Sequence, residues 1–321
     1  MIKFIKLEEV SNRIDQLILE KNHQHLFLSK KFLSYHNKRF NTYYLKYFDK
    51  KNEILTIPVV VKDNLLFSHP GASYGGILQL SNNIDFNISY FNFLKDLKQN
   101  NYILNIKLPD HQLLDRRFNK FNTLIQKNIK PTFIEEETII KLEKHNYSST
   151  ATSNFNKGHK TEINRFQNKI DFNFKKLEEK YFEEYYKILY KNTQKFNKSP
   201  THNFEEFKYL HDLFPNNIKT FCVTRKNDNH IIAGVTVFVL NSITISAFYS
   251  TYNYELGKDY LGSLKYVYWK LFSIFQNENY KYFNFGIDVP YGAKPSDSLR
   301  YFKNGFGGEQ IYRSHYDLNL K

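Results

Sequence analysis

The chain has 321 residues, of which 41% are hydrophobic and 17% aromatic, so it can build a sizeable core and is not a disordered tail. Its 46 Lys and Arg against 32 Asp and Glu give a net charge of +14, which would suit tRNA, a membrane surface or a nucleotide-bearing substrate. A single cysteine, Cys222, excludes a disulfide framework and a cysteine-based zinc site.

The basic charge by itself does not identify a partner. Only eight of the 46 basic residues are Arg, and they form no dense run, so codon bias in an AT-rich genome would explain the excess of Lys. The first residues contain acids where a signal peptide needs an apolar run. The longest apolar block, 231–240, is about half a membrane span. We therefore expect a cytoplasmic protein without stable membrane insertion.

The first half of the chain alternates helical and extended patterns. We expect helices within 11–40, with a cap at Ser29, and a helix over 87–98 where apolar residues recur at helical spacing. A short helix is expected at 112–118. Predicted strands lie at 42–48, 53–61, 65–69, 102–108, 122–126 and 132–142, with Asp63 and Asn64 as a tight hairpin connection.

The second half repeats this order of elements. Predicted helices cover 148–169, 178–196, 204–213 and 261–277, and predicted strands cover 218–225, 231–240 and 242–251. The chain then reads as a strand over 283–288, a short helix over 298–304 and a final strand over 310–318. Pro295 and Ser296 introduce that short helix, and Gly305 ends it.

The ending Phe302-Lys303-Asn304-Gly305-Phe306-Gly307-Gly308 resembles the C-terminal signature of the Fem-type transferases within the GNAT acyltransferase superfamily. The pair Gly75-Gly76 after Tyr74 is similar to the N-terminal glycine pair of those proteins. The resemblance implies an α/β fold of two tandem GNAT-like domains, each a mixed, mostly antiparallel sheet flanked by helices, packed side by side. The expected domains are 1–145 and 146–321, with the donor site in the second.

This resemblance also implies an N-acyltransferase that moves an acetyl or aminoacyl group from an activated donor to an amine. The acceptor would be a small cell-envelope molecule, amino sugar or amino acid, and it could be nucleotide-linked. We favour acyl-CoA, such as acetyl-CoA, over aminoacyl-tRNA as donor because the chain lacks the long helical hairpin of the larger Fem proteins. Two alternatives stay open: an aminoacyl-tRNA-dependent peptidyltransferase of the peptidoglycan-bridge type, and a non-catalytic binding module on a degenerate GNAT fold.

The donor site is expected where the loop 252–260 enters the helix that follows. In a GNAT domain, amides at this position and the helix dipole bind the phosphates of the donor. The candidates here are Gly257, Lys258, Gly262 and Ser263, although their spacing departs from the superfamily's Arg/Gln-x-x-Gly-x-Gly/Ala pattern. On this view Gly262→Val should block donor binding and leave the fold intact.

Lys303 and Asp288 are the catalytic candidates. Lys303 could stabilise the oxyanion that forms when the amine attacks the acyl carbonyl, and Asp288 could accept the proton of the amine. The alternatives are a solvated surface Lys and a turn or cap Asp. Because we expect Lys303 to be exposed, Lys303→Ala should lower turnover far more than stability.

The acceptor site is expected to use residues of both halves. Tyr74, Gly75 and Gly76 could line a cleft between the domains, while Lys160 and Arg165 could hold an acceptor diphosphate. Tyr249 is a further substrate-binding candidate; His36, His69 and Glu255 are weaker ones. No Ser-His-Asp or His-x-x-x-His pattern occurs, so the sequence predicts neither a hydrolase nor a metal centre.

Overall fold

The computed structural model describes residues 1–20, 25–36, 38–80, 85–115, 119–147, 154–288 and 297–319. The chain divides into two compact units. Unit 1 comprises Met1–Glu136, Leu240–Ile243 and Ile311–Lys321, and unit 2 comprises Glu137–Val239 and Thr244–Gln310. This division differs from the expected boundary at 145/146, because the last strand returns to unit 1 and pairs there with a strand of the first half.

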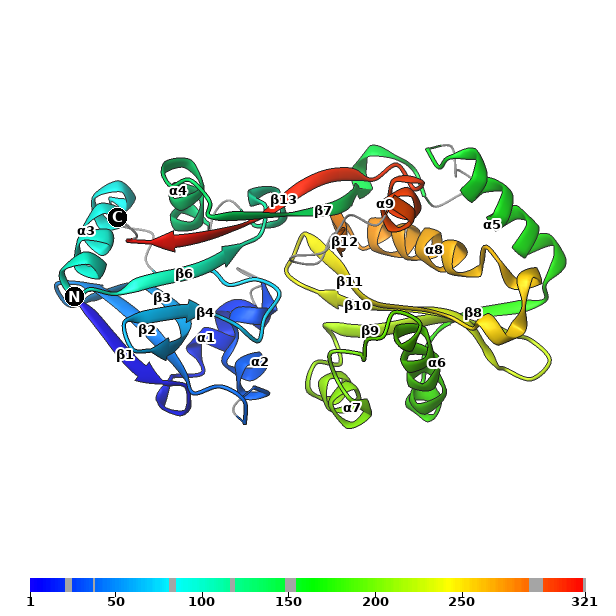
Figure 1. The fold of residues 1–321 in the computed structure, drawn as a ribbon, viewed down its shortest axis with the longest axis horizontal. Helices are drawn as coiled ribbons and strands as arrows, with labels where there is room; N and C mark the ends of the chain where they lie inside the picture. The colour runs from blue at the N-terminus through cyan, green and yellow to red at the C-terminus, as the bar shows by residue number, and fades with distance from the viewer. Residues whose placement is uncertain are drawn as a thin grey trace. The chain divides into compact units, whose positions relative to one another are not determined.

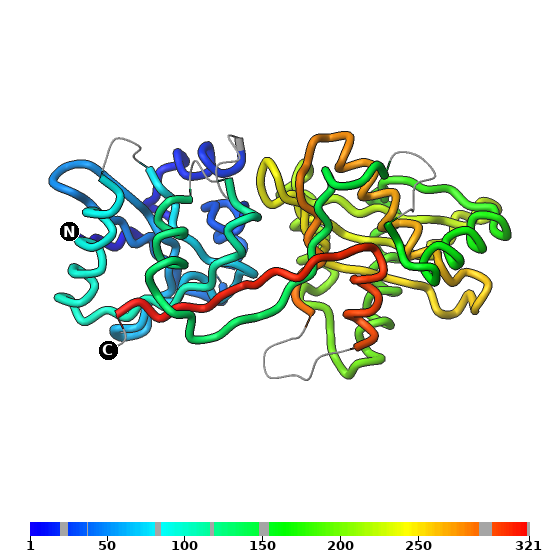
Figure 2. Tube along the Cα trace, turned by 90° about the horizontal axis from the view of Figure 1, so that it is seen from above, coloured from blue at the N-terminus to red at the C-terminus, as the bar shows by residue number. Residues whose placement is uncertain are grey.

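Unit 1 contains a mixed sheet in the strand order β1-β2-β3-β4-β6-β13. Its strands are β1 (Ile2–Lys6), β2 (Thr42–Asp49), β3 (Asn52–Lys62), β4 (Leu65–Ser68), β6 (Ile103–Leu108) and β13 (Glu309–Leu318), and β5 (Leu78–Gln79) pairs with β3. Neighbours are antiparallel except β4 and β6, which run parallel. The first and last strands of the chain therefore both belong to unit 1, as Figure 2 shows.

Two pairs of helices cover this sheet. Helices α1 (Arg13–Asp15) and α2 (Lys30–Ser34) lie on one side, and α3 (Phe86–Gln99) and α4 (Lys120–Asn128) lie on the other (Figure 1). Asp85 starts α3 by accepting hydrogen bonds from the amides of Asn87 and Ile88. The helix then buries Tyr90, Phe93 and Leu97 against the sheet, at the three- and four-residue spacing of one helical face.

Unit 2 has a sheet in the order β8-β9-β10-β11-β12-β7. The strands are β7 (Phe133–Lys141), β8 (Phe172–Lys176), β9 (Ile218–Arg225), β10 (Ile231–Val239), β11 (Thr244–Tyr252) and β12 (Tyr282–Ile287). Only β11 and β12 run parallel. Helices α5 (Lys157–Lys169), α8 (Ser263–Asn277) and α9 (Asp297–Asn304) lie on one side, and α6 (Phe182–Gln194) and α7 (Phe204–Leu213) on the other (Figure 1).

The two sheets repeat one pattern. Each runs as antiparallel neighbours, then one parallel pair, then a closing antiparallel strand. In each case the closing strand comes from the other half of the sequence: β13 closes the sheet of unit 1, and β7 closes that of unit 2. The expected α/β fold with two GNAT-like halves of mixed, mostly antiparallel sheets is confirmed.

Several predicted elements differ from the structure. The predicted strand 122–126 lies inside α4, because Phe121 and Ile125 bury one face of a helix. The predicted helix 112–118 begins as a single turn at His111–Leu113, and 116–118 lie outside the described residues, as do 148–153 of the predicted helix 148–169. Strands β1, β5 and β8 were not predicted. Pro295 and Ser296 also lie outside the described residues.

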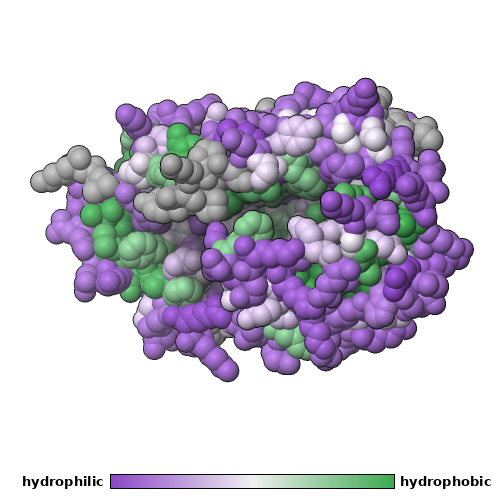
Figure 3. All heavy atoms as spheres, turned by 45° about the vertical axis from the view of Figure 1, so that its right-hand side comes forward, coloured by the Kyte–Doolittle hydropathy of each residue, from purple (hydrophilic) through white to green (hydrophobic). Residues whose placement is uncertain are grey.

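Each unit has its own hydrophobic core. In unit 2, α8 buries Val267, Leu271, Phe272 and Phe275 against β9–β12, while unit 1 packs α3 and α4 on its sheet. Outside these cores, the face drawn in Figure 3 is mostly hydrophilic, with hydrophobic residues gathered in smaller patches. Among the described helices, none combines the length and the apolar character needed to cross a bilayer.

Candidate functional site

The end of β12 and the helix α9 are joined by a buried lysine. The Nζ atom of Lys303 donates hydrogen bonds to the carbonyl oxygens of Gly286 and Ile287 and to Oδ1 of Asp288, each at 2.8 Å. Lys303 is only 4% exposed and Asp288 1%. The expectation of an exposed Lys303 is therefore wrong: two strand-end carbonyls and a carboxylate replace water around the ammonium group.

A second carboxylate lies near this ion pair. Glu137 of β7 is 1% exposed and accepts a hydrogen bond from Nδ2 of Asn284 at 3.1 Å. Thr138 donates its hydroxyl to the other oxygen of Asp288 at 2.7 Å. Burial lowers the pKa of Lys303 below its usual value, against the opposing attraction of Asp288 and Glu137.

Sequence reasoning identified Lys303 and Asp288 but missed the β7 and β12 residues around them. The missed residues are Glu137, Thr138 and Asn284. A signal was present, because Glu135, Glu136 and Glu137 interrupt an otherwise apolar strand. Alternation along that strand buries the first and third of these acids, and β7 carries the third into the cluster of Lys303.

The glycines of the C-terminal signature serve internal packing. A Cβ at Gly305 would overlap the ring of His159, whose Nε2 donates to the carbonyl of Phe302 at 2.8 Å. A Cβ at Gly308 would overlap the methyl group of Thr138, and Gly307 has a φ of +80°. The Lys-x-Gly-Phe-Gly-Gly run is thus required to seat α9 against α5 and β7.

Two other glycines have open space where a side chain would begin. Among the described glycines, only Gly257 and Gly286 have nothing within 4 Å of an ideal Cβ. Gly286 lies at the end of β12, and its carbonyl accepts from Lys303. Gly257 lies in the turn before α8, at a φ of +82°. Close packing explains neither glycine. Each has a positive φ, +77° at Gly286 and +82° at Gly257, which favours glycine, and the space beside each is open among the described residues.

The four donor-site candidates in the turn before α8 differ in their exposure to solvent. Gly257 and Lys258 are exposed, whereas Gly262 and Ser263 are buried. Gly262 has a φ of +96°, and a Cβ there would overlap the carbonyl of Glu162 in α5. Gly262 is therefore needed for contact between α5 and α8. The Ser263 hydroxyl at the start of α8 has no hydrogen-bond partner in the described part of the chain.

Of the two candidates on α5, Arg165 lies close to this turn. Its Nη2 is 3.6 Å from Oδ1 of Asp259. Lys160 is half-buried, one and a half turns earlier on the helix. The structure thus places Arg165 beside the donor-site turn.

Tyr249 is not brought together with Lys303. It lies in β11 on the side of α6 and α7, where its hydroxyl is 3.0 Å from Nδ1 of His202 and accepts from the amide of the same residue. Burial raises the pKa of Tyr249 to about 12. Its structural role is to tie β11 to the segment that precedes α7.

The N-terminal glycine pair belongs to unit 1. Tyr74 is buried, and a Cβ at Gly75 would overlap the carbonyl of Ser68, so close packing accounts for that glycine. His25 donates from Nε2 to the carbonyl of Gly75 at 2.9 Å, and burial lowers the pKa of His25 to about 4. Gly76 is also buried. The weaker candidate His69 is buried as well, bonded to Thr42.

The parallel strands β11 and β12 pair over a short ladder and then form a fork, because they separate beyond it. Their ladder joins only Thr244–Ser246 to Tyr282–Asn284, and β11 carries a bulge beyond it. The hydroxyls of Ser250 in β11 and Tyr268 in α8 are 2.6 Å apart, and the ring of Tyr268 packs on Phe285 of β12. Burial raises the pKa of Tyr268 to about 12, so its hydroxyl is neutral at physiological pH.

No three His, Cys, Asp or Glu side chains of the described ranges come together in a way that would hold a metal ion. The buried groups around Lys303 are two carboxylates, the hydroxyl of Thr138 and the amide of Asn284. Such a set suits proton transfer and the stabilisation of a developing negative charge.

Neither a protein-family model nor a curated protein matches the sequence. Solved structures do match over almost the whole chain. The crystal structure of FemX superposes with a TM-score of 0.66 at 10% identity, covering 99% of this chain and 97% of FemX. The structure of L-PGS from Bacillus licheniformis gives 0.57 at 13% identity, covering 97% and 93%. A protein of unknown function from Bacteroides thetaiotaomicron gives 0.62 at 12% identity, covering 98% of both. The chain therefore has the Fem-type, GNAT-like fold that its C-terminal signature resembles.

Proposed function

We propose that the protein is an acyltransferase that moves an acyl group from an activated donor to an amine, and that unit 2 carries the reaction. The observation that carries this proposal is the buried ammonium group of Lys303 beside the carboxylates of Asp288 and Glu137, at the end of β12. The fold shared with FemX and with L-PGS from Bacillus licheniformis supports it. The fork between β11 and β12 supports it too, because diverging strands offer backbone groups to an extended ligand.

In this reaction the amine nitrogen bonds to the carbonyl carbon of the donor, and the carbonyl oxygen gains negative charge. Lys303 supplies positive charge at the end of β12, in surroundings where water screens it little. Its three N–H groups are donated to Gly286, Ile287 and Asp288. It therefore acts through its field, or by exchanging one of these acceptors for the oxyanion.

The proton that the amine loses goes to the carboxylates beside Lys303. Asp288 and Glu137 carry two negative charges against the one positive charge of Lys303. One carboxylate of this cluster can therefore take up a proton while the other still balances the ammonium group. The leaving group departs with its electron pair and takes a proton as the carbonyl reforms.

The donor binds at the turn 257–263, where the N-terminus of the 15-residue helix α8 favours phosphate. Lys258 is exposed there, and the buried Ser263 hydroxyl lacks a partner in the described chain. We favour acyl-CoA as donor, with aminoacyl-tRNA as the alternative. The acceptor is a small amine, and Lys160 and Arg165 are the candidates to bind it if it is nucleotide-linked.

One observation favours a second candidate, a binding module without catalysis. All three N–H groups of Lys303 already have acceptors, as expected of a purely structural ion pair. In that case the open space beside Gly286 would hold a ligand without transferring a group to it.

Donor binding is tested by charge reversal at the turn before α8. We expect Lys258→Glu to weaken binding of acetyl-CoA, or of aminoacyl-tRNA, by about ten-fold, because an attractive charge near a phosphate is replaced by a repulsive one. The measurement is isothermal titration of wild type and variant with each donor in turn. Lys198→Glu, at an exposed lysine after α6, is the matched control. If both variants weakened donor binding equally, the loss would come from the change in net charge, and the donor site could not be assigned to the turn before α8.

A further inference from the structure

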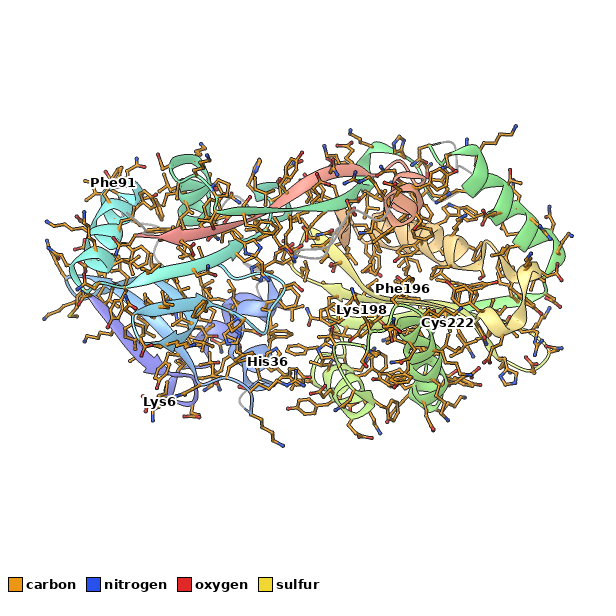
Figure 4. The ribbon with its side chains drawn as sticks, in the orientation of Figure 1. Lys6, His36, Phe91, Phe196, Lys198 and Cys222 are labelled. Atoms are coloured by element: carbon orange, nitrogen blue, oxygen red, sulfur yellow. The ribbon has the colours of Figure 1, made fainter. Side chains whose placement is uncertain are left out.

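Two large apolar side chains project from α3 in unit 1. Ile88 is 60% exposed and Phe91 63%, although the opposite face of the same helix is fully buried. Their spacing of three residues puts them on one side of the helix. Phe91 lies on the outer side of α3 in Figure 4. Single exposed apolar residues are common on proteins, but an adjacent pair on one helix is a candidate contact surface.

Lysines surround this pair. A cavity of about 560 Å³ lies between the beginning of α3 and the length of α4, lined by Phe86, Asn87, His111, Lys120, Thr123, Leu124 and Lys127. The Nζ atom of Lys120 lies 4.3 Å from the ring centre of Phe86. Lys95 and Lys98 continue the exposed side of α3 beyond Phe91. In the described part of the chain, none of these four lysines is ion-paired with a carboxylate.

The acids near this surface are already engaged. Asp85 caps α3 through two backbone amides, and Asp96 pairs with the amino group of Met1 at 2.7 Å. Asp110 accepts from the amide of Gln112 and lies 3.3 Å from Nδ1 of His111. The four lysines and the amino group of Met1 outnumber these three acids, so the balance of charge around Ile88 and Phe91 is positive.

We propose that α3 and the adjoining helix α4 bind the surface of an anionic lipid bilayer. Ile88 and Phe91 would enter the boundary between headgroups and acyl chains, as the apolar side of an interfacial helix does. Lys120 and Lys127, two turns apart on α4, would meet lipid phosphates from the edge of the cavity, and Lys95 and Lys98 from α3. This binding is independent of the acyltransferase proposal, because it uses only residues of unit 1, whereas Lys303 belongs to unit 2.

The side chains favour lipid over nucleic acid. A nucleic-acid platform relies on aromatic rings that stack on bases, with cations along the backbone. Here the aliphatic Ile88 is as exposed as Phe91, and it has no stacking surface to offer. An aliphatic and an aromatic side chain inside a ring of lysines match the composition of interfacial helices.

Sedimentation with vesicles tests the proposal. The full chain should sediment with vesicles of phosphatidylglycerol and phosphatidylcholine and stay in solution with phosphatidylcholine alone. Phe91→Asn should weaken binding by about ten-fold, from the lost apolar burial. Lys120→Gln with Lys127→Gln should weaken it by roughly thirty-fold, at about five-fold for each lysine. All these residues are exposed, and Lys120 alone among them contacts a ring, that of Phe86. The melting temperatures of the variants should therefore stay close to that of wild type.

Matched controls come from unit 2. Phe196, which is 73% exposed, and Lys198 follow α6 and are labelled in Figure 4. Phe196→Asn and Lys198→Gln should leave vesicle binding unchanged.

The proposal is overturned if wild type does not sediment with anionic vesicles, or if the control variants weaken binding as much as Phe91→Asn. Displacement from vesicles by inorganic phosphate beyond that by chloride of equal ionic strength would reveal a small-anion site. Complete displacement by bulk RNA would favour a nucleic-acid surface; either result overturns the proposal.

Discussion

Replacing Lys303 by methionine is expected to lower the free energy of unfolding by about 3–5 kcal/mol, the usual cost of removing one partner of a buried ion pair. Methionine fills much of the same space but leaves Asp288 as an uncompensated charge that is 1% exposed. It also leaves the carbonyls of Gly286 and Ile287 without their donor. Urea unfolding of wild type and variant measures the loss.

A double-mutant cycle separates the ion pair from simple loss of packing. Asp288→Asn in the Lys303→Met background should recover part of the stability, because the buried charge is gone. Lys303→Arg should recover little, since a planar guanidinium cannot place three donors on the same three oxygens. If Lys303→Met were as stable as wild type and only turnover fell, Lys303 would be the exposed catalytic residue that the sequence suggested.

Gly262→Ala is expected to destabilise the protein by about 2–5 kcal/mol. About 1–2 kcal/mol comes from placing an L-residue at a φ of +96°, and the rest from overlap with the backbone of Glu162. The earlier expectation that Gly262→Val would block a ligand and leave the fold intact is therefore wrong, because the space beside Gly262 is filled by α5 and not by a ligand. Thermal unfolding gives the comparison.

Gly158→Ala is the matched control for this effect. Gly158 lies in α5, the helix whose residue Glu162 lies against Gly262. A Cβ at Gly158 would meet its nearest neighbour, the Tyr301 hydroxyl, at 3.4 Å. We expect this substitution to be neutral or to stabilise the protein by up to about 1 kcal/mol, because alanine favours a helix over glycine. A Gly262→Ala protein as stable as Gly158→Ala would contradict the close contact of α5 with the start of α8.

The sequence predicted best those strands that form continuous apolar runs. Strands β9 and β10 of unit 2 are buried on both faces and form apolar runs, so 218–225 and 231–240 were found almost to the residue. The segment 122–126 was misassigned because its short pattern, with apolar residues around Thr123, fits a strand as well as a helix. The exchange of the closing strands was not predictable, because no local pattern states which sheet β7 or β13 will join.

The candidate site was predictable in its residues more than in its geometry. Lys303 and Asp288 were found from the signature, but the burial of Lys303 depends on the carbonyls of β12, which are far from it in sequence. Glu137 was missed because its role depends on the pairing of β7 with β12. Gly75 and Gly262 were taken for ligand-binding residues, yet each is required by a backbone that passes close to it. A glycine at a turn indicates that another group lies close to the backbone, but the sequence does not show whether that group is a ligand or another part of the chain.

Acyl transfer itself is the most direct test of the proposed function. The protein is incubated with isotopically labelled acetyl-CoA, or with labelled aminoacyl-tRNA, and a panel of amino sugars, amino acids and nucleotide-linked amines. Mass spectrometry then detects labelled amides. We expect one donor class to yield an amide product, with turnover lowered by about 10²–10³ when Lys303 is replaced by methionine and the protein stays folded. A folded wild-type protein that forms no labelled amide with either donor, while still binding one of them, would contradict the acyltransferase proposal and identify a binding module.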